Sequence, residues 1–428
     1  NVSFHLMNKI LVLAESLNKD KSSEGIATVN FLNAIDTEQF DVWCVFYEFP
    51  QFEIEKLDWI NPKIRLIHIK NNRVDAFLSK YNKLKNFFSS LFGISILKEY
   101  RVFRFRKKLN TQFADFKFDL IFSRTVATSI CSHRALVGSK LNQANRTLIY
   151  FNDPVPFSLM PPPYSNGVSY NPRFDRKEIS HVKEIISKAS MISSPSKLLN
   201  DFFINLHGDV SKATFTFPHL YLGDGASLTM DCSSYFDPEK INITHCGSLL
   251  TGRDPSNLIF GIAEFLDHNP EFKGKISVNF FGPLHHGHAR FFESTGFDFI
   301  HVVNKRITHG ESLALMYQAD LPVLIEASAE ESPFMPVKLA EMIGLGRIFL
   351  VLSPTKSETR RILGKKYKFQ TEAFNKSEII SIVSDFINKK YDQEVEEKHI
   401  KDLQEYISPK SVNSSLQQII DKFNCALS

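Results

Sequence analysis

The feature that most constrains the fold is the segment Ile325–Pro354, IEASAEESPFMPVKLAEMIGLGRIFLVLSP. An apolar run ends at Ile325 and is followed by a loop of acidic residues and prolines, which indicates a strand that ends in a turn. A helix is predicted from about Pro336, with Leu339, Met342 and Ile343 on one face and two glycines at its end. Arg347–Leu352 is then predicted as a short buried strand. A buried strand, a helix and a second buried strand in this order are typical of a parallel sheet covered by helices.

Strands and helices alternate in the same way through both halves of the 428-residue chain. That pattern indicates doubly wound parallel sheets, and the length favours two domains of roughly 200 residues each. The predicted strands are Lys9–Ala14, Asp41–Phe46, Ile64–Ile69, Leu120–Ser123, Thr147–Phe151, Met191–Ser194, Ile241–Cys246, Ser277–Gly282, Phe299–Val303 and Leu321–Ile325. The irregular stretch 217–238 is the predicted linker between a first domain over 7–216 and a second over 239–395.

Composition excludes several classes of protein. The hydrophobic share is 43% and the charged share 23%, which is typical of a globular chain. The longest apolar runs are well below the roughly 18 residues that cross a bilayer. Met7 lies just before the first predicted strand, so we expect no signal peptide, and the five scattered cysteines favour reduced thiols in the cytoplasm.

The helix start near Pro336 is a candidate anion site. Its free backbone N–H groups suit an anion such as a diphosphate. Lys338 falls in the first turn, where a cation is unfavourable beside the positive helix end but well placed for a phosphate. Glu341 lies on or near the same edge. The alternative is an ordinary packing helix that carries a solvated Lys and Glu.

Three motifs carry a family resemblance. P-V-K-L-A-E-M-I-G-L-G (336–346) resembles the donor-site signature of GT-B glycosyltransferases similar to family GT4. H-C-G-S-L-L-T-G-R-D-P (245–255) resembles the opening of their nucleotide domain, and Y-F-N-D-P (150–154) resembles a turn late in their acceptor domain. The motifs occur in the expected order over most of 7–363.

The resemblance implies an α/β protein of the GT-B fold, with two Rossmann-like, doubly wound domains that face a cleft. The first domain would bind the acceptor and the second the nucleotide sugar, with helices over 396–428 that return to the first domain. The implied activity is a hexosyltransferase-type transfer from a nucleotide-sugar donor, with retention, to a glycan or lipid-linked acceptor in polysaccharide or glycolipid assembly.

The same resemblance implies the site residues. Arg253 and Lys338 would hold the diphosphate, and Glu341 would accept hydrogen bonds from the ribose hydroxyls. Asp153 would act from the first domain on the acceptor or the donor sugar, with His133 as a weaker candidate. The remaining donor contacts would come from Gly247, Ser248, Asn304, Lys305, Arg306, Ile307, Glu331 (or Glu330), Phe334, Met335, Pro336 and Val337.

This sequence departs from the family pattern at two positions. Pro333 stands where the usual first Glu of E-x7-E would be, and Ser248 stands where many relatives have Arg. With cations and amides present, neither a metal nor a cofactor is expected to be required. The histidines at 285, 286 and 288 have a metal-like composition but lack a carboxylate or cysteine to complete a site.

The segment Arg73–Asn110 is strongly basic and rich in aromatic residues. Such a segment suits an amphipathic helix on an anionic membrane, which would place the protein in the cytoplasm and peripherally on the inner face of the cell membrane. The alternative is a crossover helix whose aromatic residues are core. No motif supports nucleic-acid binding. The sequence does not indicate the oligomeric state.

Two other functions stay open. A GT-B sugar-nucleotide epimerase also binds a nucleotide sugar, but it needs acid–base carboxylates and a histidine that converge on the sugar. A non-catalytic GT-B partner subunit is compatible with the altered E-x7-E motif and with Ser248. Retention of Arg253, Lys338 and Glu341 together counts against that alternative. Release of a nucleoside diphosphate in the presence of an acceptor distinguishes the transferase from both.

Overall fold

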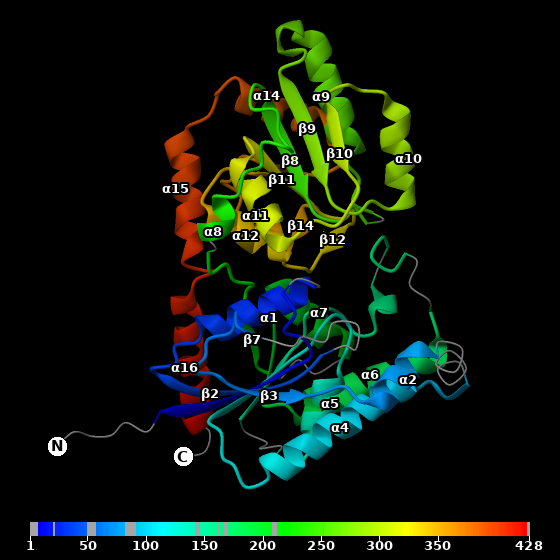
Figure 1. Ribbon diagram of the computed structural model, residues 1–428, viewed down its shortest axis with the longest axis vertical. Coiled ribbons are helices and arrows are strands. Elements are labelled where there is room, and N and C mark those ends of the chain that lie inside the picture. Colours follow the sequence, from blue (N-terminus) through cyan, green and yellow to red (C-terminus); the bar gives the residue numbers. More distant parts are fainter. Residues whose placement is uncertain are drawn as a thin grey trace, which may run out of the picture. The chain divides into compact units, whose positions relative to one another are not determined.

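The computed structural model describes residues 7–19, 22–48, 57–81, 91–141, 146–160, 162–166, 170–207, 212–223, 225–250 and 252–425 (Figure 1). The chain forms two compact units. The first comprises Asn1–Met160, Gly167–Leu220 and Ser408–Ser428, and the second comprises Pro161–Asn166 and Tyr221–Ile407.

The first unit is built on a parallel sheet with the strand order β3-β2-β1-β4-β5-β6-β7 among the described residues. The strands are β1 (Asn8–Ala14), β2 (Phe40–Tyr47), β3 (Arg65–Ile69), β4 (Leu120–Arg124), β5 (Thr147–Tyr150), β6 (Met191–Ser194) and β7 (Thr214–Thr216). Strands β4 and β5 are buried along their whole length and β1 is buried from Ile10 onward, because helices cover both faces of a doubly wound sheet. This burial explains why their sequences are nearly continuous apolar runs.

The first unit contains the helices α1 (Ser23–Ala34), α2 (Arg73–Lys80), α4 (Ile96–Gln112), α5 (Cys131–Val137), α6 (Pro172–Lys188), α7 (Lys197–His207) and the short η2 (Phe157–Leu159). Of these, α2 and α4 belong to the basic segment. Ser22 caps α1 through a hydrogen bond from the Gly25 amide to its side chain. That cap sets the direction in which α1 leaves the loop after β1.

The last helix of the chain, α16 (Pro409–Cys425), belongs to the first unit. Its apolar stripe of Val412, Leu416, Ile419, Ile420 and Phe423 is buried. The Asn413 side chain donates to the Ala34 carbonyl and accepts from the Asp36 amide at the end of α1. The preceding helix α15 (Gln393–Gln404) instead packs against α12 (Val337–Leu345) in the second unit. The chain therefore returns to the first unit at Ser408, later than the predicted residue 396.

The second unit repeats the architecture with the strand order β10-β9-β8-β11-β13-β15 among the described residues. Its strands are β8 (Ile241–Cys246), β9 (Ile276–Phe281), β10 (Ile300–Val303), β11 (Leu321–Ile325), β13 (Leu350–Leu352) and β15 (Gln370–Thr371), and β12 (Glu331–Ser332) pairs separately with β14 (Lys356–Ser357). The other helices are α8 (Gly225–Leu228), α9 (Ser256–His268), η3 (Pro270–Phe272), α10 (His286–Thr295), α11 (His309–Gln318), α13 (Glu358–Leu363) and α14 (Lys376–Ile387). The described strand pairs are parallel, which confirms the predicted fold class.

The predicted elements agree with the structure except near chain reversals. The strand predicted over Arg347–Leu352 begins only at Leu350. Gly346 ends α12 with a φ of 69°, a left-handed conformation that glycine adopts without strain, and the next residues carry the chain back to the sheet. The sequence did not predict strands β7 and β15. They contain only three and two residues, and stretches this short show no hydrophobic periodicity.

Among the described residues, no helix combines the length and the apolar character that crossing a lipid bilayer requires. The described cysteines are free thiols, as the sequence predicts.

Candidate functional site

The carboxyl-terminal edge of the second sheet gathers most of the predicted donor residues. Ligands of doubly wound folds bind at this edge, where loops leave the strands and helices begin. Here the loops after β8 and β9 approach backbone to backbone. A Cβ on Gly282 would lie 2.3 Å from the Gly247 carbonyl oxygen, so this approach requires a glycine at 282. The predicted residue Gly247 also lies at the edge, with a φ of 153°.

Lys338 and Glu341 are in direct contact. Lys338 Nζ lies 2.7 Å from Glu341 Oε2 and donates to Ser312 Oγ at 2.6 Å. The other carboxylate oxygen, Oε1, lies 3.0 Å from His309 Nε2. Lys338 and Glu341, both predicted from the sequence, therefore meet a His and a Ser from the first turn of α11. The sequence alone did not indicate either of these partners.

Glu341 is held as an anion although it is only 2% exposed. Burial by itself would raise its pKa, but the neighbouring Lys338 and His309 outweigh burial and lower the pKa to about 2. An ionised carboxylate with its remaining lone pairs free is an efficient acceptor for a vicinal diol. The geometry is therefore compatible with a ribose contact at Glu341.

The start of α12 carries no side-chain cap. Its N-cap is Pro336. Proline has no backbone N–H, so Pro336 cannot be one of the amide donors predicted over 334–337. Met335 is 3% exposed and belongs to the hydrophobic core, so its side chain does not face a ligand. An uncapped helix start beside a lysine remains a favourable position for an anion.

Arg253 lies in the loop after β8, with Nη1 donating to the Ser248 carbonyl at 3.0 Å. That loop is tied to the one after β11, because the Ser328 amide donates to the Gly252 carbonyl at 2.8 Å. Burial lowers the pKa of Arg253, while Glu326 and Tyr164 act in the opposite direction. Ser248, which replaces the Arg of many relatives, thus accepts a hydrogen bond from Arg253 through its backbone carbonyl.

Two further groups near Arg253 were not predicted. Glu326 directly follows β11 and is 4% exposed; burial raises its pKa, and Ser332 Oγ donates to its Oε2 at 2.6 Å. Tyr164 comes from the short described stretch 162–166, and its ring lies 4.9 Å from that of Phe334. A carboxylate immediately after a buried strand was a usable signal for Glu326. No local signal pointed to Tyr164.

The other predicted donor residues lie at or near this edge. Asn304 follows β10 and accepts from the Leu284 amide at 2.9 Å, while Lys305 and Arg306 are exposed and Ile307 packs against the core. Glu331 forms an exposed ion pair with Lys356 on the β12–β14 pair. No contact in the described part of the chain brings Glu331 to Lys338 or Glu341.

In the first unit, Asp153 follows β5 at the corresponding edge of its own sheet. Burial and the nearby Glu24 carboxylate raise the pKa of Asp153 to about 7. A carboxyl group with a pKa near neutrality can accept or donate a proton at physiological pH. His133 is fully buried and bonds Ser123 Oγ at 2.7 Å and the Tyr150 carbonyl at 3.1 Å, which makes it part of the core.

The histidine cluster does not form a metal site in the part of the chain that the structure describes. His285 caps α10, and His288 Nε2 lies 3.2 Å from the Leu250 carbonyl.

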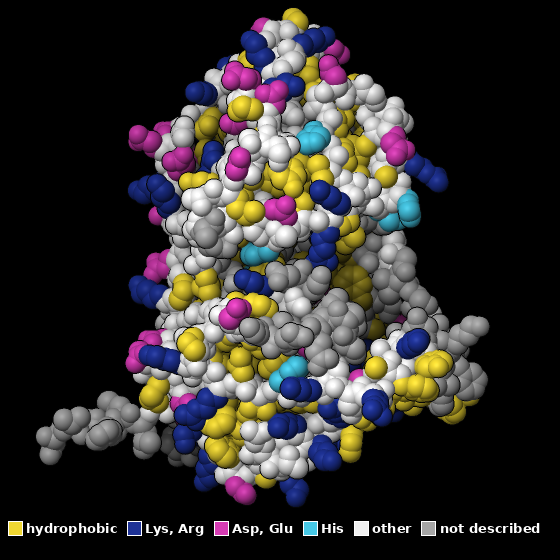
Figure 2. Space-filling view, viewed as in Figure 1, with side chains coloured by type: hydrophobic (Ala, Val, Ile, Leu, Met, Phe, Trp, Pro, Cys, Tyr) yellow, Lys and Arg dark blue, Asp and Glu magenta, His cyan; other side chains and the backbone are white. Residues whose placement is uncertain are grey.

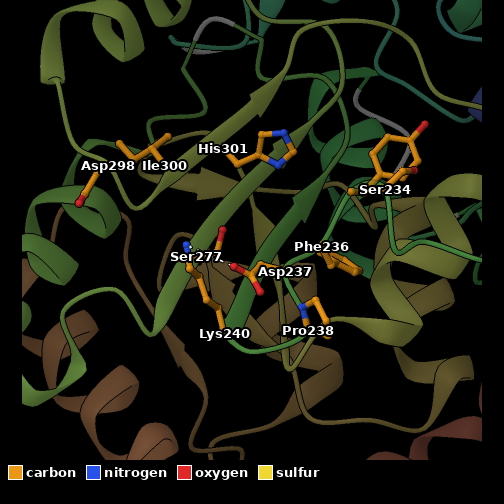
Figure 3. Close-up of a pocket in the computed structure, with 10 residues that line it drawn as sticks. Ser234, Phe236, Asp237, Pro238, Lys240, Ser277, Asp298, Ile300 and His301 are labelled. Atoms are coloured by element: carbon orange, nitrogen blue, oxygen red, sulfur yellow. Dashed lines mark ion pairs between the residues drawn. The ribbon is translucent and has the colours of Figure 1, made fainter.

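A cavity of about 480 Å³ lies elsewhere, at the amino-terminal ends of β8, β9 and β10 (Figure 3). Its polar lining includes Ser234, Asp237, Lys240, Ser277, Asp298 and His301. None of the predicted site residues lines it.

Comparisons with known proteins find similarity in structure only. No protein-family model matches the chain, and no curated protein matches it in sequence. Solved structures of the GT-B fold match nearly the whole chain, so the protein has the GT-B fold.

One similar structure is a UDP-forming trehalose-phosphate synthase from Burkholderia xenovorans, with a TM-score of 0.64, 11% identity and coverage of 98% of this chain and 100% of that one. A second is a trehalose-6-phosphate protein from E. coli bound with UDP-2-fluoro glucose, with a TM-score of 0.62, 8% identity and coverage of 97% and 99%. A third is the Anabaena protein HepE in complex with UDP, with a TM-score of 0.61, 12% identity and coverage of 97% and 100%. These matches do not single out family GT4.

Proposed function

We propose that this protein is a glycosyltransferase that moves a sugar from a nucleotide-sugar donor to a hydroxyl acceptor. The observation that carries the proposal is the Lys338–Glu341 pair at the uncapped start of α12. A cation at a helix start can pair with a diphosphate, and a buried ionised carboxylate can accept hydrogen bonds from ribose hydroxyls. Arg253 lies at the same sheet edge and supplies the second cation.

The donor is taken to be a UDP-sugar. The E. coli structure contains UDP-2-fluoro glucose, and the Anabaena structure contains UDP. The Burkholderia xenovorans protein is described as UDP-forming. UDP is therefore the first nucleotide to test. We extend the proposal to a GT4-like enzyme on the three motifs that resemble that family.

The residues have the roles that the reaction requires. Departure of the diphosphate leaves negative charge, which Arg253, Lys338 and the free amides of α12 stabilise. The reaction proceeds with retention, and the departing phosphate oxygen takes the proton of the acceptor hydroxyl on the same face of the sugar. Asp153, as a partly protonated carboxyl group, orients a hydroxyl of the acceptor or donor sugar.

The test is release of UDP from a panel of UDP-sugars, chosen first by the shift in thermal unfolding that each one produces. We expect one or few UDP-sugars to stabilise the protein and UDP release to rise when a glycan or lipid-linked acceptor is added. Conversion of one UDP-sugar into another without UDP release would indicate an epimerase. Binding without either reaction, across donors and acceptors, would indicate a non-catalytic partner.

We further propose that the acceptor is lipid-linked and that α2 and α4 contact an anionic membrane. The side chains of the described part of this segment divide into two sets. Arg104 pairs with Asp75, Lys98 pairs with Glu178 at 3.0 Å, and Phe105 and Leu109 are core residues. The outward set combines exposed apolar residues with cations: Val74, Phe77, Tyr81, Leu91, Phe92 and Phe103 with Arg73, Lys80 and Lys107. Residues 82–90 of the predicted segment lie outside the described residues.

Figure 2 shows hydrophobic and basic side chains next to one another over the region of α2 and α4. This mixture is typical of an interfacial surface, where each cation contributes on the order of 1 kcal/mol near anionic lipid. Phe103 is 58% exposed, so truncating it removes an anchor without opening the core.

Vesicle sedimentation tests the membrane contact. Phe103→Ser with Lys80→Glu and Lys107→Glu should release the protein from phosphatidylglycerol vesicles at low salt, while UDP binding stays unchanged. Arg104 and Arg106 are poor sites for charge reversal, because Arg104 pairs with Asp75 and Arg106 donates to the Arg134 carbonyl at 3.4 Å. The control is Lys273→Glu in the second unit. If the unmodified protein does not bind these vesicles even at low salt, the membrane contact is wrong and the acceptor need not be lipid-linked.

A further inference from the structure

The first turn of α11 presents two polar side chains to α12. Thr308 caps α11: its side chain accepts from the Glu311 amide, and the Glu311 side chain accepts from the Thr308 amide. This capping box fixes the backbone of the turn. His309 and Ser312 are three residues apart and therefore lie on one face of the helix. That face meets Glu341 and Lys338.

Each oxygen of Glu341 receives one donor. His309 lies 3.0 Å from Oε1 and Lys338 lies 2.7 Å from Oε2. Two donors on different oxygens fix the rotation of the carboxylate about its last side-chain bond. Each oxygen keeps a lone pair, so the pair of oxygens can still accept from two adjacent hydroxyls.

The buried carboxylate would lose its only full cation if Lys338 turned toward a diphosphate. Glu341 is 2% exposed, and leaving such a charge uncompensated is strongly unfavourable. His309 is the group that stays in place at that moment, because it is on a different helix and its side chain is only 22% exposed. Ser312 Oγ accepts from the Lys338 ammonium group at 2.6 Å in this structure, a contact that Lys338 would give up on turning.

We propose that His309 is a positioning residue for ribonucleotide recognition: it holds Glu341 in the orientation that accepts the 2′- and 3′-hydroxyls of the donor ribose while Lys338 serves the diphosphate. This inference rests on the proposed donor site. It makes a specific claim, that His309 governs preference for a ribose over a deoxyribose. A residue that merely joined α11 to α12 would affect both sugars equally.

The experiment measures dissociation constants for UDP and 2′-deoxy-UDP by calorimetry. The variants are His309→Ala, which removes the donor, and His309→Gln, which keeps an amide donor. His301→Gln is the matched control, since His301 lines the cavity at the opposite end of the second sheet. A hydrogen bond to a charged group corresponds to about tenfold to hundredfold in affinity.

We expect His309→Ala to weaken UDP by at least about tenfold and 2′-deoxy-UDP by less than about threefold. The preference for UDP should be largely restored in His309→Gln and unchanged in His301→Gln. If His309→Ala does not fold, His309→Asn decides, because its shorter amide does not reach Glu341.

Equal weakening of both nucleotides, or an unchanged preference, overturns the role of His309 and leaves the proposed function intact. A wild-type protein that binds neither UDP, ADP nor GDP overturns the proposed function and this inference with it. A preference for UDP that survives in His309→Ala but disappears in Glu341→Gln would assign the ribose contact to Glu341 without His309.

Discussion

The two units share one architecture but differ in the charge at the carboxyl-terminal edge of their sheets. In the first unit this edge carries Glu15 after β1, Glu48 after β2 and Asp153 after β5. In the second unit it carries Arg253 after β8, with Lys305 and Arg306 after β10. Lys338 adds a fourth cation from the start of α12. Each edge also carries the opposite charge, with Lys70 after β3 and Arg124 at the end of β4 in the first unit and Glu326 after β11 in the second. The contrast between an acidic and a basic edge therefore concerns the loops named above.

This difference indicates two kinds of ligand. A basic edge with an uncapped helix start attracts an anion such as a diphosphate. The acidic edge does not, and its carboxylates are largely occupied: Glu15 accepts from the Ser132 amide at 2.8 Å and Glu48 accepts from the Leu17 amide at 3.0 Å. At that edge, burial and the nearby Glu24 carboxylate raise the pKa of Asp153 to about 7.

The largest expected effect concerns Glu341 and tests whether the basic edge depends on a paired carboxylate. Its lowered pKa means that stability gained from ionisation is present above the unfolded pKa of roughly 4.3 and is lost as pH falls through about 2. Glu341→Gln should therefore lower the free energy of unfolding by about 3 kcal/mol at pH 7, with a smaller loss at pH 3. Denaturant unfolding at the two pH values measures this, and a pH-independent loss would contradict it.

The next effect is on nucleotide binding. Arg253→Ala should weaken UDP by about 2–3 kcal/mol, roughly 30- to 150-fold, because the contact is charge-assisted and largely shielded from water. Calorimetric titration with UDP measures the loss. Lys356→Ala is the control, since Lys356 forms an exposed ion pair with Glu331. Equal affinities in wild type and Arg253→Ala would remove Arg253 from the diphosphate site.

Asp153 tests the acidic edge. Its raised pKa means that its contribution is fully present below the unfolded pKa of roughly 3.9 and is lost as pH rises through about 7. Asp153→Asn should therefore stabilise the protein by about 1–2 kcal/mol at pH 8, after discounting for solvent screening, and by almost nothing near pH 3. The exposed carboxylate of Asp58 in the same unit provides the control, Asp58→Asn, for which thermal unfolding should show no such trend.

The smallest effect concerns Glu331, which the family resemblance implied for the donor sugar. Its partner is Lys356, and exposed ion pairs contribute about 0–1 kcal/mol. Glu331→Gln should therefore change UDP-sugar affinity by less than about twofold and leave the thermal midpoint nearly unchanged. A loss of tenfold or more for the UDP-sugar, with UDP itself unaffected, would show that Glu331 reaches the sugar after all.

Local sequence was sufficient for the elements and for part of the site. The observed β8 and β11 have the predicted bounds, because buried parallel strands read as short apolar runs between turn residues. The sequence placed Lys338 and Glu341 on or near one edge of the helix, and the structure shows that they form an ion pair at i, i+3 spacing. Gly247 and Arg253 were implied by the family resemblance, and the structure places both in the loop after β8, at the edge where such folds bind ligands.

Tertiary structure alone decided the partners that lie far apart in the chain. His309 meets Glu341 across 32 residues, and Tyr164 reaches Phe334 from the short stretch 162–166. It also decided which cations of the basic segment are internal, since Arg104 is paired with Asp75 while Lys107 is exposed. Periodicity reports which face of one element is apolar, but side-chain pairing depends on which two elements pack together and in which register. Only the folded chain contains that information.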